Sequence, residues 1–479
     1  MNILFISSEI IPFASSGGLG DVCAALPKTL ASMNKNVIRV MPLYGFINKI
    51  EHKIINANIP LNISFADMTF TGCVYKKVEN NLITYFIQSD DFFERDGIYY
   101  DEFGDYNDNF QRFLFFQKSI VHLIDFLNLK IDIVHCNDWQ TALIPMFLKY
   151  GVNGTPRLCK ERSLMTIHNI AHQGIFGTEK FYMTQFPLLC LSPESLEFYG
   201  NINCFKGGLV ECDAVNTVSP TYAKEILTPE FGNGLDGVLS KRGIKVSGIL
   251  NGVDYEIWNP ESDEYIKKNF NHDDLSGKKA CKKSLQEEIN FPINDEIPLF
   301  GMVSRLTFQK GLDLLAECMN VLMEKDIQII FLGTGDYVYE QKIRDWSNRW
   351  PEKIKSSLEF SVEQAHRVFA GSDLFLMPSI FEPCGQSQIF SMRYGSIPIA
   401  YKTGGLIDTV IDYPRRSSTG FLFDDFSQNS FLEKINYALS IYPNKNKWEK
   451  LIKRAMQKNF SVDNMANEYI KLYKKILQD

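Results

Sequence analysis

Short apolar runs and longer amphipathic stretches alternate along the 479-residue chain, and this pattern constrains the fold more than any other feature. Such runs are typical of strands buried on both faces of a parallel sheet, with amphipathic stretches forming the covering helices. The predicted strands are Ile3–Ile6, Val37–Val40, Ile131–His135, Leu164–Ile167, Val215–Val218, Leu299–Val303, Ile327–Leu332, Leu374–Met377 and Ile397–Ala400. Because the pattern occurs twice, it predicts two parallel α/β sheets.

A polar stretch separates the two series of strands. Residues 260–294 are rich in Lys, Asp, Glu and Asn, which is typical of a region between domains. The sequence therefore predicts an N-terminal α/β domain over residues 1–259, an inter-domain region over 260–294, and a C-terminal α/β domain over 295–455. Apolar residues at helical spacing near the end predict one or two helices, and residues 456–479 are expected to pack back on the first domain.

The composition narrows the class of protein. A net charge of −7 argues against a nucleic-acid or anionic-membrane partner. Ten cysteines without a Cys-x-x-Cys pair disfavour both a zinc site and a disulfide framework, and they are typical of reduced thiols. The first eight residues lack a basic region and are interpreted as a strand rather than a signal peptide, and no segment approaches ~18 consecutive apolar residues. The sequence predicts a cytoplasmic protein without a membrane segment.

A glycine-rich loop follows the first predicted strand and reads Ser15-Ser16-Gly17-Gly18-Leu19-Gly20-Asp21. Glycines let the backbone approach a ligand closely, and N–H groups at the start of the next helix can hold a phosphate or a polar sugar. The spacing differs from the dinucleotide pattern G-x-G-x-x-G, which disfavours an NAD site.

Two cations, Arg305 and Lys310, follow a predicted strand of the second half. Aimed at one point, they would stabilise a departing diphosphate without a metal ion; the alternative is a solvated surface pair. Further on, Glu382 and Gly385 lie where a buried strand becomes a helix. The helix start can bind an anion while Glu382 meets hydroxyl groups beside it, and the alternative is an ordinary turn capped by Ser387. A sugar diphosphate has both features.

Eight segments, in order along the chain, carry a resemblance to one enzyme family. They are residues 16–22, Val134–Pro145, Thr166–Phe176, Val218–Glu225, Gly248–Pro260, Val303–Leu315, Phe381–Gln388 and Thr403–Val410. On these motifs, and almost end to end, the chain resembles the bacterial glycogen synthases and plant starch synthases. The resemblance implies two Rossmann-like domains facing a deep inter-domain cleft, which is the B-type glycosyltransferase architecture.

The resemblance also implies a reaction. Members of the family transfer glucose from ADP-glucose to the non-reducing end of an α-1,4-glucan with retention of configuration. The implied acceptor is glycogen, starch or a malto-oligosaccharide, and the donor is a substrate, so that no cofactor and no metal are expected. The base of the donor nucleotide and the oligomeric state are left open.

Site residues follow from the resemblance by position. Arg305 and Lys310 match the cations of the donor diphosphate, Glu382 the acidic residue near the donor glucose, and His168 a histidine that contacts the transferred sugar. The remaining substrate contacts are Ser15, Gly17, Gly18, Asp21, Asp138, Trp139, Asn169, Asn251, Phe360, Cys384, Gly385, Gln386 and Ser387. Alternative interpretations are a core histidine for His168, turn residues for the two asparagines, and a core ring rather than an adenine stack for Phe360.

Three positions depart from the family pattern. Ser15 stands where the first loop normally begins with Lys, the common His-Ala-His-Asp reads His135-Cys136-Asn137-Asp138, and Val462 replaces a frequent aromatic. The missing cation indicates either reduced turnover or a degenerate member that binds glucan or sugar nucleotide without efficient transfer. Because the four matched groups Arg305, Lys310, Glu382 and His168 are intact, we expect the transferase. A sugar phosphorylase would need a pyridoxal-phosphate lysine that the sequence does not identify.

Overall fold

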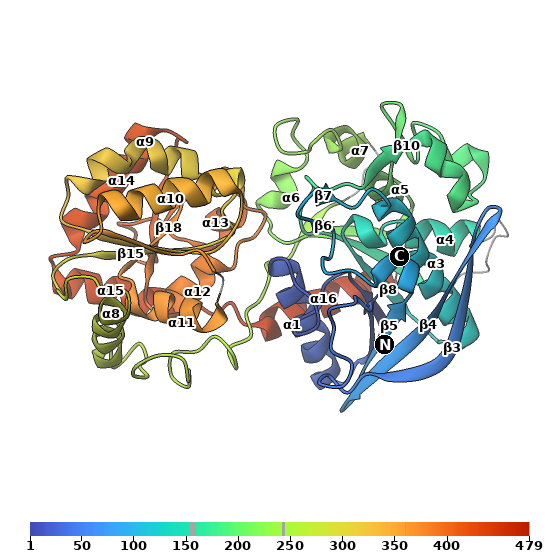
Figure 1. Cartoon of the computed structure of the whole chain (residues 1–479), viewed down its shortest axis with the longest axis horizontal. Helices are drawn as coiled ribbons and strands as arrows, with labels where there is room; N and C mark the ends of the chain where they lie inside the picture. The colour runs from blue at the N-terminus through green and yellow to red at the C-terminus, as the bar shows by residue number, and fades with distance from the viewer. Residues whose placement is uncertain (153–159, 242–244, 360, 479) are drawn as a thin grey trace. The chain divides into compact units, whose positions relative to one another are not determined.

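The computed structural model describes residues 1–152, 160–241, 245–359 and 361–478. The chain divides into two compact units, one made of Met1–Gly252 with Val462–Asp479 and the other of Val253–Ser461 (Figure 1). Each unit has helices around a sheet that is parallel in the second unit and mostly parallel in the first, so the predicted fold class of two Rossmann-like domains is confirmed. No helix in the described ranges is both long and apolar enough to cross a membrane.

The first unit is built on a sheet with the strand order β14-β13-β9-β8-β1-β2-β5-β4-β3. The strands are β1 (Asn2–Ile6), β2 (Asn36–Pro42), β3 (Ile55–Phe65), β4 (Met68–Glu79), β5 (Leu82–Gln88), β8 (Ile133–Asn137), β9 (Arg162–Ile167), β13 (Ala214–Thr217) and β14 (Ser247–Gly248). Every pair from β14 to β5 is parallel, whereas β4 pairs antiparallel with both β3 and β5. Strands β1 and β8 are almost entirely buried because helices cover both faces.

Helices of the first unit come from both ends of the chain. They are α1 (Gly18–Ser32), α2 (Asp90–Phe93), α3 (Asn109–Phe126), α4 (Ile144–Tyr150), α5 (Cys204–Glu211), α6 (Tyr222–Glu225), α7 (Asp236–Lys241) and α16 (Val462–Ile476). Helix α16, red in Figure 1, packs beside α1, drawn in blue. The Tyr473 hydroxyl donates to His135 Nδ1 (2.8 Å), and Asn216 Nδ2 donates to the Tyr469 hydroxyl (3.0 Å). These buried bonds hold α16 to β8 and β13.

The second unit has a parallel sheet with the order β17-β16-β15-β18-β19-β20. The strands are β15 (Leu299–Val303), β16 (Gln328–Leu332), β17 (Ile354–Ser357), β18 (Leu374–Met377), β19 (Ile397–Tyr401) and β20 (Phe421–Phe423). The helices are α8 (Ser276–Glu288), α9 (Leu312–Met323), α10 (Tyr337–Arg349), α11 (Val362–Gly371), α12 (Ser387–Arg393), α13 (Gly404–Thr409), α14 (Gln428–Ile441) and α15 (Lys445–Met456). Helices α9, α10 and α14 cover one face, and α8, α11, α12 and α15 the other (Figure 1).

Each sheet reverses its strand order at one place. In the first unit β1 lies between β2 and β8, and the chain extends the sheet from β1 in both directions. In the second unit β15 lies between β16 and β18 in the same way. In sheets of this topology the connections on the two sides of the central strand run to opposite faces, and ligands typically bind beside it at the carboxyl ends of the strands. The glycine loop and Asp138 follow β1 and β8, and Arg305 and Glu382 follow β15 and β18.

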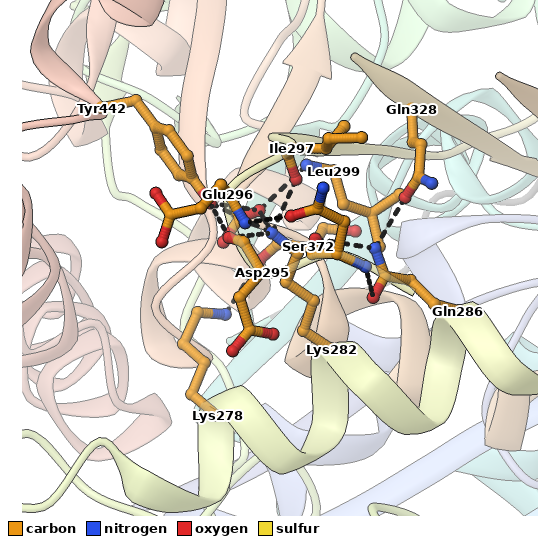
Figure 2. A network of polar contacts seen from close by, with 12 residues as sticks. Lys278, Lys282, Gln286, Asp295, Glu296, Ile297, Leu299, Gln328, Ser372 and Tyr442 are labelled. Atoms are coloured by element: carbon orange, nitrogen blue, oxygen red, sulfur yellow. Dashed lines mark hydrogen bonds and ion pairs between the residues drawn. The ribbon is translucent and has the colours of Figure 1, made fainter. Parts of the chain in front are cut away.

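Helix α8 lies in the segment 260–294 and belongs to the second unit. Its inner face carries a polar residue at every fourth position, namely Lys278, Lys282 and Gln286 (Figure 2). Lys278 Nζ donates to three backbone carbonyls at 2.8 to 3.1 Å. Lys282 pairs with the Asp373 carboxylate at 2.7 Å, and Gln286 donates to Gln328 Oε1 at 2.7 Å. These contacts satisfy polar groups at the amino ends of the strands, away from the switch point.

Replacing Lys282 with Ala should destabilise the second unit strongly. The change leaves the largely buried Asp373 carboxylate without its cation, and breaking a buried pair costs about 3–5 kcal/mol. Four of the five tryptophans, Trp258, Trp346, Trp350 and Trp448, lie in this unit, so tryptophan fluorescence during denaturant unfolding measures the effect. As a control, Tyr442→Phe removes only one hydroxyl from the same network and should cost about 1 kcal/mol. Equal losses for the two variants would contradict the ion-pair argument.

Candidate active site

The glycine loop of the first unit is held by the buried side chain of Glu9. The Ser16 N–H donates to Glu9 Oε2 (2.5 Å), and the Ser16 hydroxyl donates to Oε1 (2.7 Å). The Tyr99 hydroxyl also donates to Oε1 (2.6 Å). Glu9 is only 3% exposed, so these three donors stabilise a carboxylate that water barely reaches. Glu9 therefore fixes the backbone of the loop where the sequence predicts a ligand.

The predicted contacts of this loop lie at the start of helix α1. Gly17 is the N-cap and Gly18 is the first helical residue. Ser15 is exposed, and its hydroxyl donates to the Gly17 carbonyl (3.0 Å). Gly20 must be glycine because an added Cβ would lie 2.7 Å from Ser15 Oγ. Burial, reinforced by the charge of Glu9, raises the pKa of Asp21 to about 6.

Asp138, directly after β8, has a strained backbone. Its φ of 56° and ψ of −174° fall in a region that is nearly restricted to glycine. The strain is balanced because Asp138 Oδ1 accepts the N–H of His168 at 2.7 Å and that of Asn169 at 3.4 Å. The pKa of Asp138 is raised to about 7, mainly by burial and to a smaller extent by the charge of Glu9, while the two N–H donors oppose the shift. Strain of this kind is concentrated at functional sites.

His168, after β9, is a buried and neutral imidazole. Asn137 Nδ2 donates to the Ile6 carbonyl (2.9 Å), which leaves Asn137 Oδ1 facing His168 Nε2 at 2.9 Å. Nε2 must therefore carry the proton, and Nδ1 keeps its lone pair. Burial lowers the pKa of His168 to about 3. At neutral pH this ring can accept a hydrogen bond from a sugar hydroxyl, and it cannot act as a general acid.

Three other predicted residues of the first unit have different surroundings. Trp139 is buried and packs edge-on against Phe113 (5.1 Å between ring centroids), so it supports the Asp138 turn from inside the core. Asn169 Oδ1 accepts the Ala171 N–H (3.0 Å), as a turn residue does. Asn251 is 6% exposed, and its Oδ1 has no hydrogen-bond partner among the described residues. A buried acceptor of this kind is available to a ligand hydroxyl.

In the second unit the groups after β15 and β18 come together. Lys310 Nζ lies 2.6 Å from Glu382 Oε2, and the Ser379 hydroxyl donates to the same oxygen (3.0 Å). Gly311 makes the approach feasible, because with φ of 71° an added Cβ would lie 1.8 Å from the Pro378 carbonyl. Arg305 is exposed and makes no side-chain ion pair within the described ranges. Two cations and a carboxylate therefore surround the switch point of this sheet.

The segment after Glu382 leads into helix α12. Cys384 is buried, Gly385 has a left-handed φ of 71°, and Gln386 is the N-cap of the helix that begins at Ser387. The Ser387 hydroxyl donates to the Val303 carbonyl (3.3 Å) at the end of β15. The first N–H groups of α12 have no carbonyl partner inside the helix and can bind an anion. Phe360, the predicted adenine contact, lies outside the described residues.

Two polar residues near this segment were not predicted. The Ser304 hydroxyl follows β15 and the Thr403 hydroxyl follows β19, and both are buried without a hydrogen-bond partner among the described residues. Gly405, two residues after Thr403, donates its N–H to the Glu382 carbonyl (3.0 Å). An unsatisfied buried hydroxyl costs about 1–3 kcal/mol, so these hydroxyls are further candidates for ligand contacts.

Comparison with known proteins places this geometry in a family. Residues 2–241 match the starch synthase catalytic domain, and residues 285–457 match glycosyl transferases group 1. The chain is 40% identical over 476 residues to glycogen synthase 2 of Geobacter sulfurreducens, covering 99% of this chain and 98% of that one. It is 41% identical over 486 residues to the glycogen synthase of Thermotoga maritima, covering 100% of this chain and 99% of that one.

A solved structure agrees with these relatives. The catalytic domain of starch synthase IV from Arabidopsis thaliana, bound to ADP and acarbose, superimposes with a TM-score of 0.92 at 30% identity, covering 100% of this chain and 99% of that one. The chain belongs to the glycogen and starch synthase family of glycosyltransferases. This confirms the family that the sequence motifs indicate, and with it the B-type glycosyltransferase fold.

For this member of the glycogen and starch synthase family, sequence reasoning named the residues after the strands and missed their partners. Glu9 and Tyr99 organise the glycine loop, and Asn137 orients His168. A signal for Asn137 existed, since it is the position where the common motif has His. Glu9 lies just beyond the first strand, but nothing in the local sequence connects it to Tyr99, 90 residues away.

The pKa of Asp138 predicts a pH dependence of stability. The folded pKa of about 7 exceeds the ordinary aspartate value of 3.8, so the folded protein holds an extra proton between these pH values. The contribution of the protonated Asp138 carboxyl to stability is complete below the pKa that it has in the unfolded protein. This contribution is lost as the pH rises through the pKa of the folded protein. Asp138→Asn keeps the Oδ1 acceptor but does not titrate. Between about pH 5 and about pH 8, the wild type should therefore lose more thermal stability than the variant in calorimetry.

Asp67→Asn is the matched control, because Asp67 is exposed in the turn between β3 and β4 of the same unit. This variant should lose as much thermal stability as the wild type over the same pH range. If Asp138→Asn shows the same loss, the carboxyl of Asp138 is already ionised in the folded protein at low pH.

The contact with Asn137 predicts the protonation of the His168 ring. Asn137→Leu keeps the approximate size of the side chain but removes the acceptor for the Nε2 proton. The proton can then move to Nδ1, which no longer keeps its lone pair in every molecule. Turnover should fall about tenfold, since an unsatisfied buried group costs about 1–3 kcal/mol. Nitrogen NMR of the His168 ring should report a single Nε2-protonated form in the wild type and a mixture in the variant. An unchanged spectrum would show that another group sets the tautomer.

Proposed function

We propose that the protein transfers glucose from ADP-glucose to the non-reducing end of an α-1,4-glucan, with retention of configuration. The observation that carries the proposal is the group of Arg305, Lys310 and Glu382 at the second switch point, in a chain about 40% identical to glycogen synthases. ADP as the nucleotide is supported by the ADP bound to the similar starch synthase IV domain. Retention follows chemically, because ADP-glucose and the glucan both carry α-linked glucose.

The second unit supplies the donor groups in this proposal. Arg305 and Lys310 hold the diphosphate and stabilise the charge that develops as the bond from glucose C1 to the β-phosphate oxygen breaks. Lys310 is paired with Glu382, so the donor phosphates would compete with a carboxylate for this cation. Glu382, freed from the ammonium, accepts hydrogen bonds from glucose hydroxyls and remains bonded to the Ser379 hydroxyl.

The first unit supplies groups for neutral sugar. His168 accepts a hydroxyl hydrogen bond at Nδ1, and Asn251 Oδ1 and the glycine-loop backbone offer further polar contacts. The acceptor 4-hydroxyl oxygen forms the new bond to C1, and its proton passes to the departing phosphate oxygen. No side chain acts as a nucleophile in this scheme.

The reaction is proposed to need neither a metal nor a cofactor, because the two cations provide the charge that a divalent ion provides in other transferases. The test supplies ADP-glucose and glycogen to purified protein and measures ADP release together with the α-1,4 linkage by NMR. ADP release should persist when EDTA is added. Loss of transfer in EDTA with recovery on adding magnesium would reject the metal-free mechanism, and glycogen binding without ADP release would indicate the degenerate binding module. Better use of UDP-glucose would reject the donor assignment.

Ser15 is the site of a specific prediction. Ser15 stands where the first loop of the family normally begins with Lys, so an added cation at position 15 is expected to strengthen the stabilisation of the departing phosphates. Two unit charges ~4 Å apart interact by roughly 4 kcal/mol at an effective dielectric near 20, and a surviving ~1.4 kcal/mol gives about a tenfold rate change. Ser15→Lys should therefore raise turnover about tenfold with little change in acceptor affinity, in steady-state kinetics of ADP release.

Ser15→Met is the control, since it adds a chain of similar length without charge and should leave turnover near the wild-type value. Lys310→Ala should remove most activity in either background. Unchanged or lower turnover in Ser15→Lys would mean that other groups already neutralise the phosphates.

A further inference from the structure

A small hairpin of the first unit presents aromatic rings to solvent. Strands β6 (Tyr100–Asp101) and β7 (Gly104–Asp105) pair antiparallel, with Glu102 and Phe103 at the turn (Figure 1). Phe103 is 90% exposed and Tyr100 is 55% exposed. Two large rings on one short hairpin, with more than half of each side chain exposed, are available for an interaction with another molecule.

The base of the hairpin is rigid. The ring of Tyr106 lies between the guanidinium groups of Arg95 and Arg112, each 4.7 Å from its centroid. Tyr106 donates its N–H to the Tyr99 carbonyl (3.0 Å), which closes the hairpin. Arg112 is fully buried and also donates to the Ile98 carbonyl (2.9 Å). The exposed rings are therefore carried by a fixed frame, which reduces the entropy lost when a ligand binds.

The same hairpin is attached to the glycine loop. Tyr99 leads into β6, and its hydroxyl donates to Glu9, the carboxylate that also holds Ser16. A molecule bound along the glycine loop therefore has the hairpin as its neighbouring surface. This continuity connects the exposed rings to the sugar-contacting groups of the first unit.

Charge and ring chemistry select the class of ligand. The exposed acidic residues Asp101, Glu102 and Asp105 lie on the same hairpin as the rings, and their charge would repel a polyanion. Aromatic faces pack on the apolar faces of pyranose rings, while carboxylates accept hydrogen bonds from sugar hydroxyls. A neutral, hydroxyl-rich chain satisfies both features.

We propose that the Tyr100–Phe103 hairpin binds the α-glucan acceptor at glucose units remote from the reacting end. This proposal rests on the proposed transferase function and specifies which acceptors are favoured. A long chain extends many glucose units beyond the reacting end, so we expect the hairpin to matter for glycogen and not for maltose. The hairpin thus contributes to acceptor affinity and leaves the chemical step unchanged.

The first test measures glycogen binding without donor, by retardation in native gels containing glycogen. Phe103→Ala should weaken binding about fivefold or more, and Phe103→Trp should retain it because the ring face is kept. In steady-state kinetics, Phe103→Ala should raise the KM for glycogen by a similar factor. The kcat, the KM for ADP-glucose and the KM for maltose should stay at wild-type values. The gel does not require catalysis, so it separates failure of this proposal from failure of the proposed function.

Phe126→Ala is the matched control. Phe126 is a 54% exposed ring at the other end of α3, about 26 Å along the helix axis from Asn109, whose side chain bonds to Tyr99. This variant should bind glycogen like the wild type. Wild-type glycogen affinity in Phe103→Ala would overturn the proposal, and so would equal weakening in Phe103→Trp. A changed oligomeric state with unchanged glycogen affinity would also overturn it, by assigning the hairpin to a contact between copies of the chain.

Discussion

The site residues of each unit depend on one constraint, the reversal of strand order beside a central parallel strand. Parallel strands place all their carboxyl ends at one edge of the sheet, and right-handed crossovers send the chain to opposite faces on the two sides of the central strand. At β1 and β15 this leaves room for polar loops at the end of an otherwise apolar sheet. The glycine loop, Asp138, Lys310 and Glu382 all occupy such positions. The apolar runs that fix the strands therefore also fix where the chemistry can occur.

Much of this fold could be predicted because the central strands are buried on both faces. The predicted strands Leu299–Val303 and Leu374–Met377 coincide with β15 and β18. The hairpin of β3 and β4 was missed because exposed and buried residues alternate along the second half of β3 and Val74 alone is buried in β4, so neither strand forms a continuous apolar run. Helix α8 was interpreted as a polar link for a similar reason. Its lysines can be buried because their ammonium groups donate hydrogen bonds to backbone carbonyls of distant segments. The local sequence does not show these acceptors, so a lysine there is expected to be exposed.

The candidate site was predictable only for residues that follow strands and match a motif. What the residues contact is set by tertiary structure. Trp139 could be foreseen beside Asp138, but its packing against Phe113 comes from a helix that precedes it by many residues. The partner of His168 is Asn137, one strand away, and it decides which ring nitrogen carries the proton. Sequence gives the side chains at a site, whereas protonation and charge depend on burial and on neighbours from other elements.

The two switch points differ in electrostatic character, and this difference fits two kinds of ligand. In the first unit burial raises the pKa of Asp138 to about 7 and lowers that of His168 to about 3, so charge is suppressed around a surface suited to neutral hydroxyl groups. In the second unit Arg305 and Lys310 suit an anion. In the proposed mechanism the ammonium of Lys310 moves from Glu382 to a donor phosphate. The Ser379 hydroxyl then still donates to the same oxygen of the Glu382 carboxylate, and the phosphates compensate the charge of the ammonium.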